Sequence, residues 1–325
     1  MKNVDETRTK EQLASLLHVS PKEIVNLLAR IDRFYRAKPI PKSNGRIRTL
    51  LIPMGRLLLV QSKILEHIFG GVSFPKHLHG GIKHKSNITN ARVHSNKTAV
   101  LKFDIKDYFP SVRPAQILLV FESLGFYGEA AAILTRLTTF RHQLPQGSPT
   151  STALANLAFS RGDARLLGIA RKHNFDFTRY VDDSALSGGS RVGDFSNLAR
   201  RIVEEEGFEI KGNTPELMRQ SERQTLTGIG LNFKLNVSRE RREEVLTHAA
   251  SVVRSGELPT RQLEGKLAWL SSVNPNLGKR IGKQLKARRQ KAKQVWNEAS
   301  RSRHRNNTGN EASRGDCRRD QKTVA

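Results

Sequence analysis

The chain has 325 residues, with 56 lysines and arginines against 30 aspartates and glutamates, and its formal net charge is +26 at pH 7. Such an excess of cations favours a polyanionic partner, nucleic acid above all, bound through salt-dependent phosphate contacts. The single cysteine, Cys317, excludes an internal disulfide framework or a cysteine zinc site, and the absence of a signal peptide or a long apolar run leads us to expect no membrane contact and a cytoplasmic location.

Two short helices are predicted at the amino terminus, over residues 10–17 and 21–35. Ser20 is a suitable N-cap, and Pro21 suits the first helical position. Apolar residues recur at helical spacing in both segments. A DNA-binding helix-turn-helix is one interpretation, but no basic recognition face follows the second helix, so a packing hairpin is favoured.

A basic β-hairpin is predicted over residues 40–53, where Asn44-Gly45 is a strong turn signal. Lys42, Arg46 and Arg48 surround the turn, as would suit a finger over an incoming triphosphate. Plain solvent exposure is the alternative for any one of these side chains.

An apolar helix over residues 55–69 leads into a loop with three histidines and then into a second short helix, over 87–95. No carboxylate or cysteine near the histidines completes a metal site, so we expect them to contact RNA or solvent. The histidines are His77, His79 and His84. Asn90 and His94 would share one face of the second helix.

Strand alternation over residues 99–105 places Leu101, Phe103 and Ile105 on one face and Val100, Lys102 and Asp104 on the other. An apolar face packed on helices would leave Asp104 on an open face. A capping or turn acid is the alternative, because Asp107 and Pro110 follow closely. A later segment, Gln146-Gly147, precedes a predicted helix over 150–171, whose first backbone N–H groups are free to bind a ligand.

The run Phe175 to Gly188 predicts a β-hairpin with Asp182 and Asp183 at its tip. Two carboxylates this close repel one another unless divalent cations neutralise them. Asp104 would be the third acid of a site for two cations, as in metal-dependent nucleotidyl transfer. An ordinary Asp-Asp turn is the alternative reading of this tetrapeptide alone.

From residue 236 onward the pattern is helical, over 239–253, 261–273 and 276–296. Residues 279–293 carry eight basic side chains and no acid, which favours a polyanion contact over a merely solvated helix. After residue 298 the composition becomes polar and basic, and we expect a disordered tail over 299–325.

Five of these segments, in this order, resemble motifs of reverse transcriptases, and two of them resemble signatures of the bacterial retron branch. The matching segments are Asn90-Ala91-Arg92-Val93-His94, Phe103 to Phe109, Leu144 to Pro149, Tyr180 to Asp183 and Leu226-Thr227-Gly228. The last has Leu where the retron pattern usually has Val. The similarity runs from about residue 10 to about residue 275.

The resemblance implies an α+β fold, the right-hand polymerase, with an antiparallel palm sheet, fingers and a helical thumb. The expected domains are an amino-terminal helical segment at 1–38, fingers and palm at 39–235, a thumb at 236–298 and the tail at 299–325. The implied activity is RNA-templated DNA synthesis from dNTPs with two Mg²⁺ ions, Mn²⁺ being a possible substitute. Their ligands would be Asp104, the backbone at Ile105, Asp182 and Asp183.

Further roles follow from the resemblance alone. Phe109 would pack under the sugar and exclude a 2′-hydroxyl, and the other nucleotide contacts would be Arg48, Gln146, Gly147 and Lys211. Lys211 occupies the position where the family usually has Asn. It is a candidate for the general acid, and a solvated surface lysine is the alternative. The implied RNA contacts are Asn90, His94, Thr227, Gly228, Lys286, Arg288 and Arg289; a buried hydrogen-bonding pair is the alternative for the first two.

Retron enzymes bind a partner noncoding RNA, start DNA synthesis from one of its 2′-hydroxyls, leave a branched RNA–DNA product and are linked to antiphage defence. The resemblance therefore implies these partners and a separate effector protein. A group II intron or diversity-generating reverse transcriptase, a non-catalytic RNA-binding scaffold and a DNA-binding regulator built on residues 1–40 are the alternatives.

Overall fold

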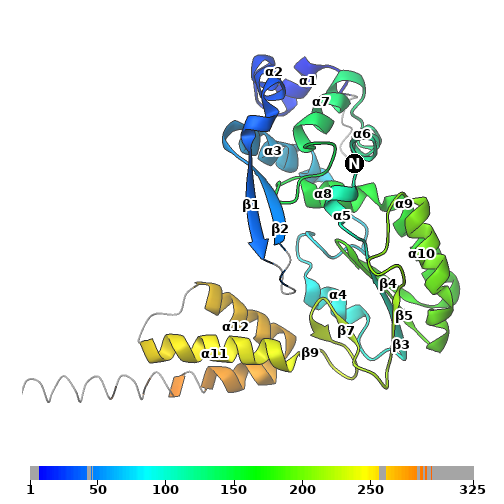
Figure 1. Ribbon diagram of the computed structural model, residues 1–325, viewed down its shortest axis with the longest axis vertical. Helices are drawn as coiled ribbons and strands as arrows, with labels where there is room; N and C mark the ends of the chain where they lie inside the picture. Colours follow the sequence, from blue (N-terminus) through cyan, green and yellow to red (C-terminus); the bar gives the residue numbers. More distant parts are fainter. Residues whose placement is uncertain are drawn as a thin grey trace, which may run out of the picture. The chain divides into compact units, whose positions relative to one another are not determined.

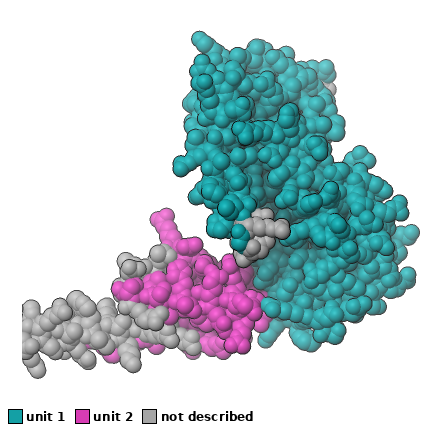
Figure 2. Space-filling model, in the orientation of Figure 1, with its two compact units in different colours: residues 1–234 teal, residues 235–325 magenta. Residues whose placement is uncertain are grey.

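The computed structural model describes residues 7–41, 45, 47–255 and 261–283, together with 286, 287, 290 and 294. The chain forms two compact units, residues 1–234 and 235–325, drawn in teal and magenta in Figure 2. Among the helices of the described residues, none combines the length and apolar character that crossing a membrane requires. Arg288, Arg289 and the predicted tail lie outside the described residues.

Helices gather at one end of a two-stranded hairpin in the amino-terminal part of the first unit (Figure 1). The elements are α1 (Lys10–Leu16), α2 (Pro21–Ala29), the 3-10 helix η1 (Ile31–Phe34), β1 (Tyr35–Pro41), β2 (Ile47–Pro53), α3 (Gly55–His67), the 3-10 helix η2 (Phe69–Gly71), α6 (Pro114–Ser123) and α7 (Gly128–Thr138). Ser20 caps α2 with Pro21 in its first turn, as predicted. The prediction of one helix to residue 35 is wrong, because the backbone leaves the helical region at Arg30.

The first two helices pack on α7 and on each other. Their apolar stripe is buried, with Leu13, Leu17 and Ile24 fully inaccessible to solvent. This arrangement agrees with a packing hairpin, because the side chains that define the stripe are used up in the core.

A four-stranded antiparallel sheet in the order β4-β5-β3-β6 forms the centre of the first unit. The strands are β3 (Ala99–Asp104), β4 (Asp176–Tyr180), β5 (Asp183–Gly188) and β6 (Glu216–Arg219), and the helices around them are α4 (Asn87–Val93), α5 (Tyr108–Ser111), α8 (Ser151–Ala158), α9 (Ser160–His173), the 3-10 helix η3 (Ser190–Phe195) and α10 (Ser196–Glu205). The strand predicted over residues 99–105 is confirmed and ends at Asp104, and the hairpin predicted over residues 175–188 is confirmed as well. The α+β fold with an antiparallel sheet, which the resemblance implies, is therefore confirmed, and we call this four-stranded sheet the palm sheet.

The register of this sheet gives its two faces different surroundings. Opposed residues in antiparallel strands share a face. Leu101, Phe103 and Leu186 lie on the face that packs into the main core. The opposite face carries Asp104 opposite Asp183 at one end. Its other end is covered by α4, so Val100, which the sequence places on the open face, is buried.

The predicted single helix over 150–171 is two helices, α8 and α9, which meet at Phe159. The Phe159 ring occupies the space that a side chain at Gly162 would need. The chain bends at this point, and the bend allows both Asn156 from α8 and Asp163 from α9 to reach Arg179 on β4. Periodicity alone could not show the break, since both helices continue the same apolar pattern.

A small hairpin completes the first unit, and the second unit is helical. The hairpin consists of β7 (Thr225–Leu226) and β8 (Ile229–Gly230); the second unit contains β9 (Asn236–Val237), α11 (Arg239–Ser255) and α12 (Arg261–Val273). Residues 275–283 are also helical. Leu263, Leu270, Leu277 and Ile281 are buried, while Lys279, Arg280 and Lys283 face solvent.

Candidate active site

Three aspartates meet at one end of the palm sheet. Asp104 is the last residue of β3 and pairs with Asp183, the first residue of β5. Asp182 lies in the turn between β4 and β5, and its carbonyl accepts a hydrogen bond of 2.9 Å from the Ile105 amide. The turn is thus fastened to the strand that carries the first acid. Both Asp104 and Asp183 keep partly exposed side chains.

The electrostatic environment of these acids disfavours their charged forms. Burial raises the pKa of Asp183 to about 7; Lys102 opposes the shift, whereas Asp104 and Asp182 add to it. Burial likewise raises the pKa of Asp182, and Asp104 adds to that effect while Lys211 and Arg48 oppose it. Carboxylates arranged in this way are stabilised by a bound cation.

The donor set fits a hard divalent cation. Within the described residues no group of three or more His, Cys, Asp or Glu side chains is already closed around a metal position. Nevertheless, Oδ1 of Asp183 is buried without any hydrogen-bond partner. A buried carboxylate oxygen with no donor is costly unless a cation approaches it, and carboxylates are the ligands that Mg²⁺ and Mn²⁺ prefer.

The turn that carries Asp182 is strained. Val181 has φ of 61°, a left-handed conformation that is unfavourable for a β-branched side chain. Gly80 lies directly beneath it, because a Cβ at residue 80 would come within 2.6 Å of the Val181 nitrogen and 2.9 Å of the Tyr180 carbonyl carbon. The loop at residues 77–80 runs alongside β4, with the His79 amide donating to the Arg179 carbonyl.

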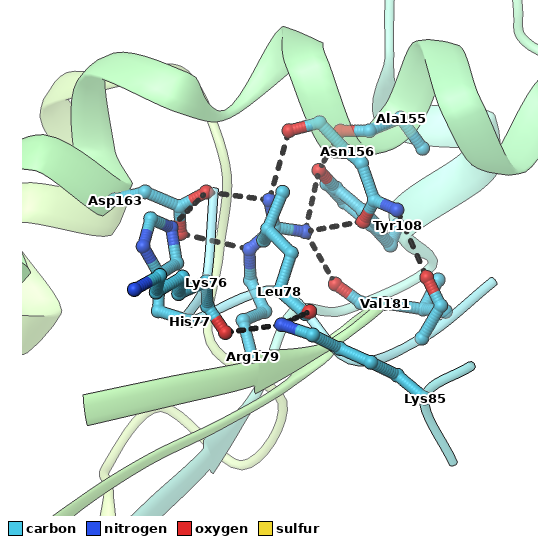
Figure 3. A network of polar contacts seen from close by, with 11 residues as sticks. Lys76, His77, Leu78, Lys85, Tyr108, Ala155, Asn156, Asp163, Arg179 and Val181 are labelled. Carbon is cyan, nitrogen blue, oxygen red and sulfur yellow. Dashed lines mark hydrogen bonds and ion pairs between the residues drawn. The ribbon is translucent and has the colours of Figure 1, made fainter. Parts of the chain in front are cut away.

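A buried polar network stands behind this turn, and Figure 3 shows it. Arg179 is completely buried and forms a bidentate ion pair with Asp163 at 2.8 and 2.6 Å. Sequence reasoning missed both residues and Gly80. The available signal was a charged residue on the same face of the strand as Phe177, which belongs to the core, because a charge at such a position requires a buried partner.

Two of the three loop histidines are not where the sequence placed them, whereas His84 is exposed, as expected. The His77 side chain is 8% exposed, with Nε2 at 3.5 Å from Asp163. His79 is buried, and its Nδ1 lies 2.9 Å from the Thr89 hydroxyl. The expectation of RNA or solvent contacts for these two is therefore wrong, because both rings are taken up in packing the loop against β4.

Two predicted nucleotide contacts approach the acids from neighbouring elements. Lys211 lies beside the end of β3. Its amide donates a hydrogen bond of 2.8 Å to the Asp104 carbonyl, and its Nζ lies 3.9 Å from Asp104 Oδ2. Arg48 on β2 is exposed, and its charge is near enough to Asp182 to oppose the rise that burial causes in the pKa of that carboxyl. Each could therefore neutralise anionic groups that bind beside the acids.

The other predicted nucleotide contacts, Phe109, Gln146 and Gly147, lie in α5 and in the loop that precedes α8. Phe109 belongs to α5, immediately after the Asp104 strand, and is half-buried against the core. The Gln146 carbonyl accepts a hydrogen bond of 2.8 Å from Leu51 on β2. Gly147 has φ of +122°, and a Cβ there would lie 3.3 Å from the Leu51 carbonyl oxygen. The loop is thus held close to β2 by a residue that has to be glycine.

The structure does not offer Asn90 and His94 to RNA. Both are completely buried. The Thr178 hydroxyl lies 2.5 Å from Asn90 Oδ1 and 2.7 Å from His94 Nε2, and His94 Nδ1 lies 2.7 Å from the Ser187 hydroxyl. The predicted RNA contact is therefore wrong for the side chains of this pair, and the buried hydrogen-bonding alternative holds: they fasten α4 onto β4 and β5.

Thr227 lies beside the acids in the turn between β7 and β8. Its φ is 47°, and a hydrogen bond from its backbone partly offsets the rise that burial causes in the pKa of Asp183. Gly228 follows with φ of +81° and is exposed. Lys286 is exposed on the second unit, and Arg288 and Arg289 fall outside the described residues. An RNA contact by these residues stays a prediction.

Comparison with known proteins finds no matching family model. The Retron Mx65 reverse transcriptase of Myxococcus xanthus is 32% identical over 314 residues, covering 86% of this chain and 72% of the relative. The Retron Ec86 reverse transcriptase of Escherichia coli is 27% identical over 274 residues, covering 83% and 86%. Among solved structures, Candida albicans telomerase with a telomeric RNA fragment aligns with a TM-score of 0.49 and 13% identity, covering 79% of this chain and 54% of that one.

Proposed function

This chain belongs to the retron reverse transcriptases, and from that premise we propose that it copies a cognate noncoding RNA from a primer 2′-hydroxyl within that RNA. It is an RNA-directed DNA polymerase, whose template is RNA. The proposed product is a single-stranded DNA that stays joined to the RNA through a branch. We further propose that this takes place in the cytoplasm, in antiphage defence together with a separate effector protein.

The observation that carries the catalytic proposal is the meeting of Asp104, Asp182 and Asp183, with one buried carboxylate oxygen left without a partner. As the reaction requires a divalent metal, we propose two Mg²⁺ ions, replaceable by Mn²⁺, held by these acids and the Ile105 backbone. Divalent cations supply charge that activates the attacking hydroxyl and balances the leaving pyrophosphate.

The chain's own side chains orient the incoming dNTP. Arg48 and Lys211 approach the acids from two directions and would bind the triphosphate oxygens, Lys211 being also the candidate general acid. Gln146 and Gly147, fastened to β2, would contact the terminal base pair or the template. Phe109 would lie under the sugar and exclude a 2′-hydroxyl, which selects deoxynucleotides.

The remaining surfaces would bind the nucleic acids. We propose that residues 39–235 act as fingers and palm, that 236–298 act as a thumb, and that 1–38 support the fingers. Thr227 and Gly228 lie close enough to Asp183 to meet the primer, and Lys286, Arg288 and Arg289 would contact the RNA backbone. The net charge of +26 supports this extensive phosphate contact.

A test in cells distinguishes the proposed priming from ordinary reverse transcription. The chain is expressed with its flanking upstream DNA, beside the Asp182→Ala, Asp183→Ala double variant, and short DNA is separated on a denaturing gel. A wild-type product that ribonuclease shortens supports an RNA-linked DNA. If purified protein extends a supplied primer on RNA but the native flank yields nothing, the chain primes like another branch; inactivity in both assays would favour the RNA-binding scaffold.

A further inference from the structure

Arg179 carries a guanidinium with none of its surface accessible to solvent, on β4 two residues before the turn that carries Asp182 and Asp183. Burying a charge is costly unless it is paired and all its donors are used. Arg179 meets that condition. Nε and Nη2 bond both carboxylate oxygens of Asp163, and Nη2 also donates 2.9 Å to the Asn156 carbonyl.

The remaining nitrogen of Arg179, Nη1, points toward the turn, as Figure 3 shows. It donates 2.7 Å to the carbonyl oxygen of Val181 and 3.2 Å to Oδ1 of Asn156. The Tyr108 hydroxyl, which also donates to the Ala155 carbonyl, lies 3.5 Å away. One guanidinium therefore links α5, α8, α9 and the residue just before Asp182.

The Val181 carbonyl is the acceptor that matters for the site. Val181 is held in the left-handed region at φ of 61°, a conformation that persists only where surrounding contacts over-determine it. Gly80 supports this turn from below, and the hydrogen bond from Arg179 fastens its carbonyl from the core side. The neighbouring peptide groups carry Asp182 and Asp183, whose positions follow from that of the turn.

An ordinary structural ion pair is the competing explanation for Arg179. Burial lowers the pKa of Arg179, but the Asp163 carboxylate more than reverses this, so the pair stays charged. Replacing a buried ion pair by apolar residues of similar volume is often neutral or stabilising. Stability alone therefore does not require an arginine here. Bridging Asp163 and the Val181 carbonyl at the same time does require one, because only a forked guanidinium reaches both.

We propose that Arg179 is a positioning residue of the polymerase, which holds the Val181 carbonyl and thereby sets Asp182 and Asp183 for cation and nucleotide binding. The proposal rests on the proposed catalytic role of these two aspartates. The Asp163 carboxylate orients the guanidinium, and Asn156 and Tyr108 fix its plane. Lysine cannot replace it, because one ammonium does not span both partners.

The test compares two replacements of the pair in the full-length protein. Arg179→Lys keeps the charge beside Asp163 but shortens the reach to Val181. The double variant Arg179→Met, Asp163→Leu removes both charges together, so that neither is left buried alone. Lys97→Met is the matched control, since it breaks a 2.6 Å ion pair with Asp176 at the opposite end of the same strand.

Three readouts separate positioning from folding. Hydrogen exchange of the amides at 181–184 reports the turn itself, and the rise in melting temperature on adding Mn²⁺ reports cation binding without catalysis. Primer extension on RNA gives kcat. For both replacements we expect circular dichroism like that of the wild type, turn amides that exchange roughly tenfold faster or more, a smaller Mn²⁺ effect, and kcat lower by about 100-fold. The control should stay within about twofold in kcat.

A second site then tests the stated cause. Glycine adopts left-handed φ without strain. In a Val181→Gly background the turn therefore depends less on the hydrogen bond from Arg179 to the carbonyl of residue 181. We expect the Arg179 replacements to lose several-fold less activity in that background. Equal losses in both backgrounds, or folded variants with unchanged turn exchange, would overturn the proposal. A wild-type protein that fails to extend primers would instead refute the proposed function. Hydrogen exchange of the turn amides would still test whether Arg179 holds the turn, because it does not depend on catalysis.

Discussion

Replacing Gly80 with alanine should directly displace the turn that carries Asp182. Gly80 lies in the loop beside β4, and its carbonyl accepts a 2.9 Å hydrogen bond from the Asn156 side chain. The added methyl would overlap Val181 Cγ2 and come within 2.6 Å of the Val181 nitrogen. A valine side chain can rotate away, but a backbone nitrogen moves only with its peptide group.

The size of the displacement follows from these distances. To restore an ordinary contact of 3.4 Å, the Val181 nitrogen has to retreat by about 0.8 Å. Because Asp182 is the next residue, its carboxylate moves by a similar amount. Misplacement on the order of 1 Å costs about 100-fold in rate where reacting groups must be aligned, and overpacking of this kind costs about 1–3 kcal/mol of stability.

The assay is single-turnover primer extension on RNA under saturating dNTP, with stability measured by urea unfolding of the same samples. Gly168→Ala is the matched control. Gly168 is exposed in α9, and a Cβ there meets nothing within 4 Å. We expect this control to keep its activity and to gain about 0.5–1 kcal/mol of stability, as alanine is the better helix former.

If the folded Gly80→Ala variant extended primers at the wild-type rate, the reasoning would be refuted. Either the acids would tolerate the displacement, or the loop at residues 77–80 would move in place of the turn. A variant that simply unfolds in the assay buffer would be distinguished by its urea curve. In that case Gly80→Ser at reduced temperature repeats the steric test.

Three further outcomes are expected. Asp183→Asn should abolish extension yet raise the melting temperature in EDTA, because it removes a buried charge that Asp104 and Asp182 repel; a lower melting temperature would contradict this. Burial lowers the pKa of His94 to about 3, so the stability gained from its neutral form is complete above pH 6.5 and is lost as the pH falls toward 3, at up to about 1.4 kcal/mol per pH unit. His94→Gln should therefore flatten the decline in urea stability between pH 6.5 and 4.5, and an unchanged slope would exclude His94 as its source. Phe109→Ala should raise the incorporation of ribonucleotides relative to deoxynucleotides by roughly tenfold or more in competition assays, whereas an unchanged ratio would remove Phe109 from sugar selection.

Local pattern was sufficient for the elements that carry the acids. Alternation over residues 99–105 predicts β3 and its acid at the open end, and the two apolar runs around Asp182 predict the hairpin. Such predictions succeed because strand periodicity and turn chemistry act between residues that are neighbours in the chain. The resemblance to reverse transcriptases rested on the same short segments, and it agrees with the relatives found.

The predictions from sequence failed where contacts between distant segments decide whether a residue is buried or a helix is broken. Asn90 and His94 share a helix face, as their spacing indicates, but only the packing of α4 on β4 and β5 determines that this face is buried. The break at Phe159 depends on a ring filling the space above Gly162. His77 and His79 were expected to contact RNA or solvent because their partners, Asp163 and Thr89, are not adjacent to them in the sequence.

The sequence by itself determined much of the chemistry of this protein: which residues are acidic, which segments form the strands beside the acids, and a charge excess that favours a polyanionic partner. Only the tertiary structure decided how the acids are held, through Gly80 beneath the turn and Arg179 behind it. The physical reason is that a buried charge and a strained turn are stable only when partners converge on them from distant segments. That convergence is a property of the folded chain, which periodicity and composition do not record.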